Sequence, residues 1–311
     1  MKLSLIIPCY NESENVKLFY NEAIKALKDY INETEFIFVN DGSKDDTLVK
    51  LNELVESSNY EIKVIDFSRN FGKEAALLAG LKESKGDYVS IIDADLQQNP
   101  SYVADMINFL DTHEDYDSVA MVQETRKESK ILCFFKNCFY KLINKLTEIE
   151  FKPSASDFRT LRREVVETII SLSERCRFSK GIFAWVGYNT YFATYEVQER
   201  ANGESKWSFW KLFSYALDGI TAFSTAPLVL SSFFGILICI IAFLLILVVI
   251  FKTLVWGDPV AGFPTLVILI LFSMGIQLIC IGILGQYLAK TYTEVKMRPH
   301  YVIKQKIQKN K

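Results

Sequence analysis

The sequence carries a pair of aspartates in a setting that suits a divalent metal ion. Asp93 and Asp95 directly follow the apolar run Tyr88–Ile92, which has the length and composition of a buried strand. Two carboxylates one residue apart at a strand end can bind the same hard cation and leave coordination positions for phosphate oxygens. Such a cation neutralises charge that develops on a diphosphate leaving group. A lone D-x-D pair is also common in solvated turns, so the surrounding residues must decide between the two interpretations.

Other polar side chains follow the ends of two earlier apolar runs, Leu3–Ile7 and Glu35–Val39. If all three runs are parallel strands, their carboxyl ends meet at one edge of the sheet, where ligands of such sheets bind. Acceptor oxygens there could take the N–H of a uracil-type base and the hydroxyl groups of a ribose. The residues concerned are Pro8, Tyr10, Glu12 and Asp41. Taken alone, Asn40–Ser43 is more typical of a simple turn.

The first half of the chain alternates strand and helix patterns, which predicts an α/β fold: a mostly parallel, Rossmann-like sheet with helices on both faces. The expected strands are Leu3–Ile7, Glu35–Val39, Ile62–Phe67, Tyr88–Ile92 and Ser118–Val122. Helices are expected near Asp45–Ser57, Gly72–Glu83 and Ser101–Leu110, and a first helix is expected to start at a capping box, Asn11–Glu14, and to reach Ile31. No G-x-G-x-x-G follows the first strand, which argues against a nucleotide-dependent oxidoreductase.

The composition of the 311 residues argues against several classes of protein. A formal net charge of −2 gives no indication of binding to nucleic acid. Six cysteines occur without a C-x-x-C pair, so we expect reduced packing residues. With only two histidines, a histidine-based zinc site is not expected.

Two uncharged stretches, Pro227–Phe251 and Phe263–Ala289, are each long enough to span a membrane as a helix, which needs about 20 apolar residues. The connection between them is short and nearly uncharged, whereas lysine and arginine gather in 290–311. By the positive-inside rule, both termini are expected in the cytoplasm. The basic segment either contacts an anionic leaflet or is a solvated terminus. The expected organisation is an α/β domain at 1–205, juxtamembrane amphipathic helices at 206–225, two spans within 226–289 and a basic tail at 290–311.

Two further segments, 131–146 and 207–223, interleave aromatic and aliphatic residues with lysines. Each could lie in the membrane interface with its apolar face down, and the second runs directly into the first predicted span. The alternative is an ordinary amphipathic helix packed on the domain.

Taken together, the polar clusters resemble the motifs of inverting family 2 glycosyltransferases of the GT-A fold. The motifs are, in order, Pro8-Cys9-Tyr10-Asn11-Glu12, Asp41-Gly42-Ser43, Arg69-Asn70-Phe71-Gly72-Lys73 and Asp93-Ala94-Asp95-Leu96-Gln97. Two downstream motifs, Ser156-Asp157-Phe158-Arg159 and Arg200-x-x-Gly203-x-Ser205-Lys206, narrow the resemblance to polyprenyl-phosphate glycosyltransferases. That group includes dolichyl-phosphate mannose synthase and bacterial bactoprenol glucosyl transferases. The resemblance covers nearly the whole chain.

The resemblance implies a role for each candidate residue. Asp95 would be the principal ligand of Mg²⁺ or Mn²⁺, with Asp93 beside it. Arg200 and Lys206 would close over the donor diphosphate, where cations stabilise developing negative charge. Arg126 would bind the acceptor phosphate through forked hydrogen bonds. The nucleotide-sugar would contact Pro8, Tyr10, Glu12, Asp41, Asp93 and Gln97.

The family has an aspartate near the reacting centre at the position of Asp157, which could act as a base, orient a sugar hydroxyl or pair with Arg159. An ionised phosphate acceptor hardly needs a base. Asn40 stands where many relatives have an aspartate, so the charge at this position is lost while Asp41 is retained.

The reaction implied by the resemblance is inverting transfer of a single sugar from a UDP-sugar to a polyprenyl (undecaprenyl) phosphate. It would take place at the cytoplasmic face of a bacterial inner membrane, with glucose favoured as the sugar, N-acetylglucosamine next and a GDP-sugar last. The Gln-x-x-Arg-Trp motif of processive polysaccharide synthases is missing from the sequence. Small residues in the spans favour a homo-oligomer, namely Gly235, Gly275, Gly282 and Gly285. The alternative is a catalytically quiet membrane scaffold or nucleotide-sugar sensor, which the intact carboxylates disfavour.

Overall fold

The computed structural model describes residues 2–123, 144, 152, 155–196, 220–256 and 262–309. Within these residues, eight strands form one sheet in the order β7-β5-β6-β4-β1-β2-β3-β8. The bounds are Leu3–Cys9 (β1), Thr34–Asn40 (β2), Glu61–Phe67 (β3), Tyr88–Ile91 (β4), Ser118–Gln123 (β5), Ala155–Arg162 (β6), Thr190–Tyr195 (β7) and Ile303–Gln308 (β8). Strands β1 to β4 are mutually parallel, whereas β6 and β8 run antiparallel to their neighbours. The predicted α/β fold class is therefore confirmed.

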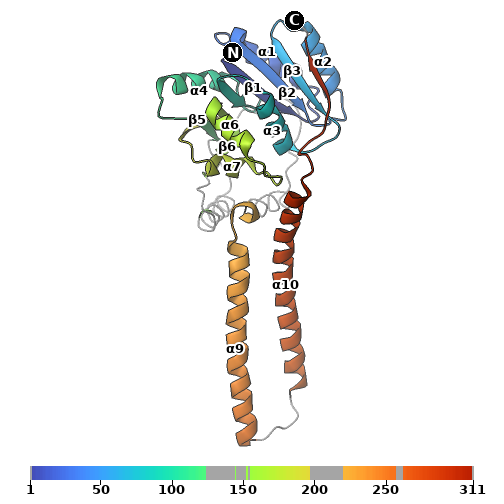
Figure 1. The fold of residues 1–311 in the computed structure, drawn as a ribbon, viewed down its shortest axis with the longest axis vertical. Coiled ribbons are helices and arrows are strands. Elements are labelled where there is room, and N and C mark those ends of the chain that lie inside the picture. Colours follow the sequence, from blue (N-terminus) through green and yellow to red (C-terminus); the bar gives the residue numbers. More distant parts are fainter. Residues whose placement is uncertain are drawn as a thin grey trace.

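Helices cover both faces of the sheet (Figure 1). One face carries α1 (Val16–Ala26), α2 (Thr47–Ser57) and α4 (Ser101–Thr112). The other face carries α3 (Lys73–Glu83), α6 (Arg163–Ser171) and α7 (Ser179–Trp185). A short 3₁₀ turn, η1 (Ile31–Glu33), precedes β2. The two remaining long helices, α9 (Ala226–Trp256) and α10 (Phe263–Lys296), extend away from the domain side by side (Figure 1).

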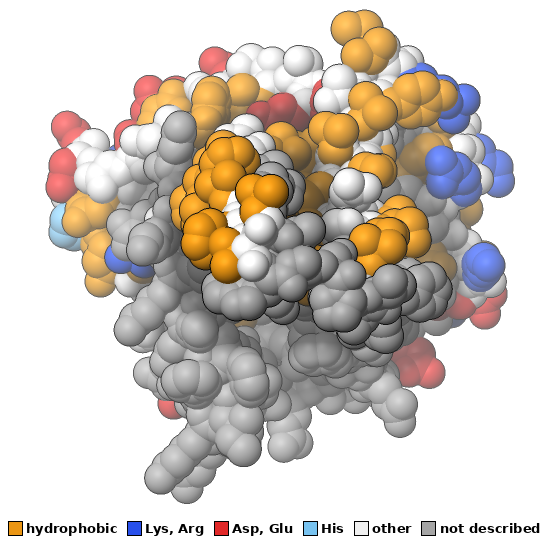
Figure 2. All heavy atoms as spheres, turned by 90° about the horizontal axis from the view of Figure 1, so that it is seen from below, with side chains coloured by type: hydrophobic (Ala, Val, Ile, Leu, Met, Phe, Trp, Pro, Cys, Tyr) orange, Lys and Arg blue, Asp and Glu red, His pale blue; other side chains and the backbone are white. Residues whose placement is uncertain are grey.

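Helices α9 and α10 contain stretches that are long and apolar enough to cross a membrane, Ala226–Leu245 and Phe272–Lys296. At a rise of about 1.5 Å per residue, each helix is longer than the apolar core of a bilayer, which is about 30 Å thick. Large apolar side chains on both helices are exposed, such as Leu254 and Leu278. Seen along the helices from their far end, the described side chains of the pair are largely apolar, and charged side chains lie towards the rim of the domain (Figure 2). Both helices are therefore candidate spans, as predicted.

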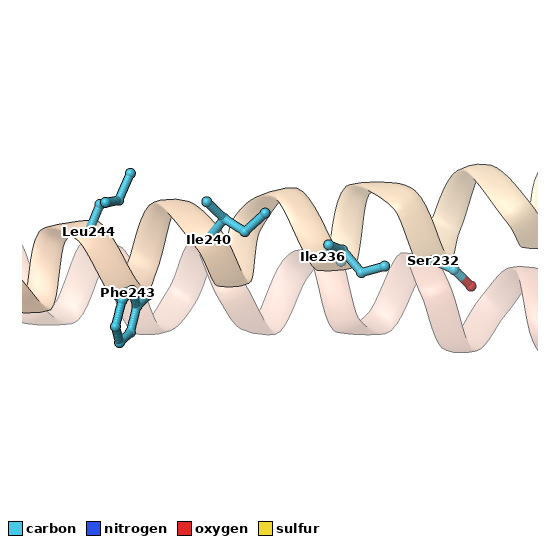
Figure 3. A pocket seen from close by; sticks show the side chains of 6 residues that line it. Ser232, Ile236, Ile240, Phe243 and Leu244 are labelled. Atoms are coloured by element: carbon cyan, nitrogen blue, oxygen red, sulfur yellow. The ribbon is translucent and has the colours of Figure 1, made fainter.

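An apolar hollow of about 510 Å³ lies along α9 (Figure 3). It is lined by Ser232, Gly235, Ile236, Ile240, Phe243 and Leu244. Most of these residues are three or four apart in sequence and therefore share one face of the helix. A Cβ atom added at any of the glycines of α9 or α10 would meet no atom within 4 Å, so the packing of these helices within one chain does not require them. The predicted homo-oligomer stays a prediction.

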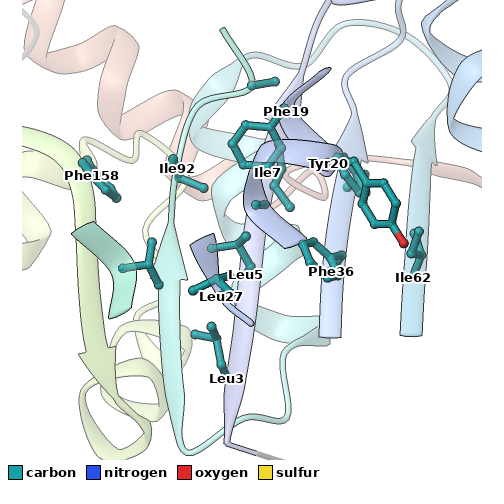
Figure 4. Packing of buried hydrophobic residues seen from close by; sticks show 14 of the residues in the cluster. Leu3, Leu5, Ile7, Phe19, Tyr20, Leu27, Phe36, Ile62, Ile92 and Phe158 are labelled. Carbon is teal, nitrogen blue, oxygen red and sulfur yellow. The ribbon is translucent and has the colours of Figure 1, made fainter. Parts of the chain in front are cut away.

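The core forms because successive side chains of β1 point to opposite faces of the sheet. Leu3, Leu5 and Ile7 pack with Phe19 of α1 on one face (Figure 4), and Ile6 packs beneath α3 and α6 on the other. All five side chains are fully buried. Burial of a side chain of this size contributes about 1.5–3 kcal/mol. The central strand is thereby anchored on both faces, and its carboxyl end has a fixed position.

Helix α1 begins later than the predicted capping box. The helix starts at Val16, and the preceding Asn15 makes no side-chain capping hydrogen bond. Asn11 has a φ of 55°, outside the helical region. Its side-chain Oδ1 accepts a hydrogen bond from Lys44 N at 2.9 Å, and its backbone N donates to Ser43 Oγ at 2.9 Å. The capping-box prediction is wrong because Asn11 instead joins the loop after β1 to the loop after β2.

The basic C-terminal segment, predicted as a tail, forms the end of α10 and a strand of the sheet. Strand β8 pairs antiparallel with β3, which would otherwise be an edge strand with unpaired backbone groups. Ser68 N donates to Val302 O at 3.0 Å, and the Tyr301 ring stacks on Phe67 with centroids 4.9 Å apart. The strand is short and rich in lysine and glutamine, so the apolar pattern does not predict it.

A row of polar side chains crosses β2, β3 and β8. Asn40 Nδ2 donates to Asp66 Oδ1 at 2.8 Å, and Gln305 Nε2 donates to Asp66 Oδ2 at 3.2 Å. Asn40 and Asp66 are both buried. Because Asp66 already provides the negative charge, an aspartate at position 40 would face a second carboxylate. This arrangement accounts for the asparagine that departs from the Asp-Asp-Gly-Ser pattern.

We expect Asn40→Asp to lower the free energy of unfolding by about 2 kcal/mol, because a hydrogen-bond donor is replaced by a second buried negative charge. The exchange variant Asn40→Asp/Asp66→Asn again has one carboxylate and one amide, and should recover most of the loss. Thermal unfolding of the purified chain in detergent measures both effects. Equal stability of Asn40→Asp and the wild type would contradict this account of the row.

Candidate active site

A cavity of about 260 Å³ opens at the carboxyl ends of β1, β2 and β4. Its lining consists of Pro8, Cys9, Tyr10, Glu12, Asp41, Asn70, Gly72, Lys73, Ala76, Asp93, Ala94 and Asp95. The structure thus brings together most of the residues that the sequence assigns to the nucleotide-sugar and the metal. Gln97 is the exception within the described part of the chain, because it does not line the cavity.

The cavity lies at the end of the domain nearest the candidate spans. Helix α10 ends at Lys296 and β8 begins shortly afterwards at Ile303, so the start of β8 lies close to the spans. Ile303 pairs with Phe67, the last residue of β3, because the two strands are antiparallel. Strands β1, β2 and β4 are parallel to β3, and their carboxyl ends therefore face the same way (Figure 1).

Asp41 holds the loop that forms one wall of the cavity. Its Oδ1 accepts a hydrogen bond from Phe71 N at 2.6 Å, and its Oδ2 accepts one from Gly72 N at 2.9 Å. Burial raises the pKa of the Asp41 carboxyl, although these two N–H groups and Arg69 favour the ionised form. The next residue, Gly42, has a φ of +61°, and a Cβ there would lie 2.3 Å from the Arg69 carbonyl carbon. Both residues therefore permit the close approach of the loop.

The turn after β4 presents the aspartate pair to the cavity. Leu96 has a φ of 59°, in a region that residues other than glycine rarely adopt. Gln97 N donates to Asp95 Oδ1 at 3.1 Å, and Asp93 N donates to Gln98 Oε1 at 3.1 Å. Gln97 therefore contributes to the turn through its backbone. The buried side chain of Gln98 fixes the backbone of Asp93 by accepting its N–H.

A single ammonium group joins a carboxylate that follows β4 to a carboxylate on β6. Lys73 Nζ lies 2.7 Å from Asp93 Oδ1 and 3.2 Å from Asp157 Oδ2. The antiparallel register of β4 and β6 pairs Ile91 with Arg159, which puts Asp157 level with Asp93. Burial lowers the pKa of Lys73, but the two carboxylates outweigh burial and raise this pKa well above its ordinary value. Lys73 is therefore charged at physiological pH.

Positive charge surrounds Asp157. Burial raises the pKa of the Asp157 carboxyl, but Lys73, Lys180 and Arg159 outweigh burial and hold that pKa below its ordinary value. The Arg159 guanidinium lies 3.6 Å from the centroid of the Phe183 ring, and burial lowers its pKa to about 10. The Arg159 Nε has no hydrogen-bond partner within the described residues. Lys73, Lys180 and Arg159 thus keep the Asp157 carboxyl ionised.

Three predicted site residues lie outside the described residues: Arg126, Arg200 and Lys206. Their contacts with the acceptor phosphate and the donor diphosphate stay predictions. Most of the two amphipathic segments, 131–146 and 207–223, also lies outside the described residues.

Lys73 is a site residue that the sequence motifs do not assign to the site. It belongs to the quoted motif Arg69–Lys73, but its partners are far away in the chain. The contact with Asp157 depends on β6 lying next to β4 in the sheet, which no local pattern reveals. One signal could have indicated this role: Lys73 is the first residue of a helix that directly follows the loop of a recognised motif.

The sequence of the chain also matches known proteins. Residues 4–170 match the family described as glycosyl transferase family 2. The SfII prophage-derived bactoprenol glucosyl transferase of Shigella flexneri is 42% identical over 306 residues, which cover 98% of each chain. The bactoprenol glucosyl transferase of Shigella phage SfV is 42% identical over 311 residues, covering 99% of this chain and 100% of the relative. The prophage bactoprenol glucosyl transferase homolog of Escherichia coli (strain K12) is 40% identical over 306 residues, covering 98% and 99%.

The protein is a glycosyltransferase with a GT-A type of α/β fold. The chain belongs to glycosyl transferase family 2. The match over residues 4–170 and the full-length relatives confirm the predicted family, and the mostly parallel sheet confirms the predicted fold.

We expect Asp41→Asn to loosen the loop that contains Phe71 and Gly72, because an amide provides only one acceptor oxygen for two N–H groups. Hydrogen bonds to a charged group contribute about 1.5–3 kcal/mol, so amide exchange in this loop should become about 10 to 100 times faster. Hydrogen–deuterium exchange with mass spectrometry measures the change. Asp46→Asn, at an exposed position in the loop after β2, is the matched control and should leave the exchange unchanged.

We expect Lys73→Met to destabilise the protein by about 1–2 kcal/mol at pH 7, because two carboxylates lose the partly exposed cation between them. The depressed pKa of Asp157 means that its ion pair stabilises the fold above the unfolded-state pKa of about 3.9 and ceases to do so as the pH falls through the folded-state pKa. The difference in thermal stability from the wild type should therefore stay nearly constant from pH 7 to about pH 4 and shrink as the pH falls below about 4. Lys73→Arg keeps the charge and should lose less. A difference that does not shrink as the pH falls below about 4 would contradict the role of the ion pair.

Proposed function

We propose that this glycosyltransferase transfers a single glucosyl residue from UDP-glucose to a polyprenyl phosphate, with inversion, at the cytoplasmic face of a bacterial membrane. The observation that carries the proposal is the acidic cavity at the end of the domain nearest two candidate spans. Relatives named bactoprenol glucosyl transferases align with nearly the whole chain and support both the sugar and the lipid acceptor. N-acetylglucosamine is the second choice of sugar.

The cavity suits a nucleotide diphosphate held together with Mg²⁺ or Mn²⁺. Asp93 and Asp95 offer carboxylate oxygens, which these hard cations prefer, and they leave positions for phosphate oxygens. Among the described residues, no three acidic, histidine or cysteine side chains gather closely enough to hold a metal ion. A cation shared between the protein and the donor fits such a site. When bound, the cation would neutralise charge on the departing diphosphate.

Lys73 and Asp157 organise the reacting centre in this proposal. Lys73 keeps Asp93 and Asp157 together and provides positive charge beside the cavity, where it attracts the donor diphosphate. In this proposal Lys180 and Arg159, which also lie near Asp157, attract the phosphate charge of the acceptor. Because an ionised phosphate already has its nucleophilic oxygen, we assign Asp157 to orienting the substrates rather than to removing a proton.

The bond changes of the proposed reaction are simple. A phosphate oxygen of the acceptor forms a bond to the anomeric carbon from the side opposite the diphosphate. The bond between that carbon and the diphosphate oxygen breaks, and its electron pair leaves with the nucleotide. No proton needs to move, and a donor with an α-linked sugar gives a β-linked polyprenyl-phosphate sugar.

The same geometry supports the proposed arrangement at the membrane. The carboxyl ends of the parallel strands face the candidate spans, so a phosphate at the membrane surface can reach the cavity while its lipid chain stays in the bilayer. The basic residues of 290–311 support a cytoplasmic position of the domain and both termini. In this proposal Arg126 contacts the acceptor phosphate, Arg200 and Lys206 contact the donor diphosphate, and the chains assemble into a homo-oligomer.

We expect the purified full chain in detergent to transfer labelled glucose from UDP-glucose to undecaprenyl phosphate with Mn²⁺ or Mg²⁺ present. Removal of the cation with EDTA should abolish the transfer. Asp95→Asn should lower the rate about a hundredfold or more, which is the usual loss when electrostatic stabilisation of a transition state is removed. Extraction of the lipid phase and counting of label measure the product.

The matched control is Asp105→Asn, which changes an exposed aspartate of α4 that does not line the cavity. This variant should keep the wild-type rate. A panel of UDP-N-acetylglucosamine and GDP-sugars decides the donor. Full activity of Asp95→Asn would refute the proposed metal site, and no transfer from any donor by folded protein would favour a membrane scaffold or nucleotide-sugar sensor.

A further inference from the structure

The domain-proximal end of α10 contacts the loop between α6 and α7. Glu294 Oε1 accepts hydrogen bonds from Arg175 N at 2.7 Å and from Cys176 N at 2.9 Å. Arg175 Nη1 donates to the Arg298 carbonyl at 2.5 Å, just beyond the end of α10. A carboxylate that accepts two backbone N–H groups makes a directional, charge-assisted contact. This contact therefore holds α10 and the loop in one relative orientation.

The start of α9 contacts the same region of the domain. A Cβ at Gly181 of α7 would lie 2.2 Å from Phe223 Cε2, so only glycine allows this approach. The rings of Phe178 and Phe223 have centroids 6.1 Å apart. Tyr287 Oη donates to the Ser224 carbonyl at 2.5 Å, which joins the start of α9 to α10. Both candidate spans therefore converge on α7 and the loop before it (Figure 1).

Helix α7 also contacts the residues of the reacting centre. Ser179, its first residue, donates hydrogen bonds to the Glu74 carboxylate from its hydroxyl and from its backbone N, the latter at 2.9 Å. Glu74 directly follows Lys73, the residue that joins the two carboxylates. Phe183 of α7 packs against the Arg159 guanidinium. Helix α7 thus lies between the ends of the spans and the charged centre.

We propose that Glu294 is a positioning residue, which holds the reacting centre at a fixed height and orientation over the membrane surface through the loop 175–176 and α7. The inference rests on the proposed function, because it concerns the delivery of a phosphate from a lipid surface. Glu294 does not belong to the described lining of the cavity. Its loss should therefore impair reaction with a membrane-embedded acceptor and spare both donor binding and reaction with a soluble acceptor.

The test compares two acceptors with the full-length chain. One is undecaprenyl phosphate in phospholipid vesicles, and the other is a short-chain, water-soluble isoprenyl phosphate in detergent. We expect Glu294→Ala to raise the KM for the vesicle acceptor about tenfold, while the donor KM and the kcat/KM for the soluble acceptor change less than about twofold. Glu294→Gln keeps an acceptor oxygen and should recover most of the difference. Thr293→Ala, which removes a hydroxyl bonded to Ala289 O within α10, is the matched control.

A second measurement does not depend on activity. The backbone N–H of Cys176 donates to Glu294, so loss of this carboxylate should loosen the loop around the Cys176 thiol. Alkylation of this thiol by a maleimide should therefore become severalfold faster in Glu294→Ala and not in Thr293→Ala. Mass spectrometry of the Cys176 peptide measures the rate. Unchanged KM values together with unchanged alkylation in Glu294→Ala would overturn the positioning role. A wild-type enzyme that transfers sugar to neither acceptor would refute the proposed function, whereas the alkylation rates would still decide whether Glu294 holds the loop.

Discussion

The charged centre depends on the ammonium group of Lys73, because it lies between two carboxylates that would otherwise repel each other. Asp93 follows β4 and Asp157 lies on the neighbouring β6, so the pairing of these strands brings two negative charges together. Partial burial strengthens both the repulsion and the attraction that offsets it. The position of Lys73 is determined by α3, which packs on the sheet through Leu77 and Leu81. The acidic strand ends and the start of this helix therefore form one unit.

Much of the fold and of the cavity could be predicted from the sequence, because the relevant signals are local. Apolar runs such as Leu3–Ile7 identify the strands, and the polar residues that follow them must gather once the strands are parallel. Glu12, Asp41 and Asp95 lie together for this reason. The candidate spans could be predicted from length and lack of charge alone.

The remaining features depend on partners that are distant in sequence. Asn11 is a residue type that often caps helices, yet its side chain accepts a hydrogen bond from Lys44 N instead. No local pattern distinguishes these outcomes. Asp41 was expected to contact a base, and the structure gives its carboxylate two backbone partners in the loop after β3. The ion pair of Lys73 with Asp157 requires knowledge of the strand order. In each case the residue type indicated a polar role, but the tertiary partner could not be predicted from the local sequence.

Strand β8 constrains the order in which the chain can complete its fold during synthesis. Strand β3 emerges from the ribosome early, but the strand that covers its edge is encoded after both long helices. The polar row through Asn40, Asp66 and Gln305 also needs this last segment. A growing chain must therefore hold an unfinished sheet while α9 and α10 are being made. The eighth strand can join the sheet only in a chain that already carries both helices, which links completion of the sheet to the synthesis of both candidate spans.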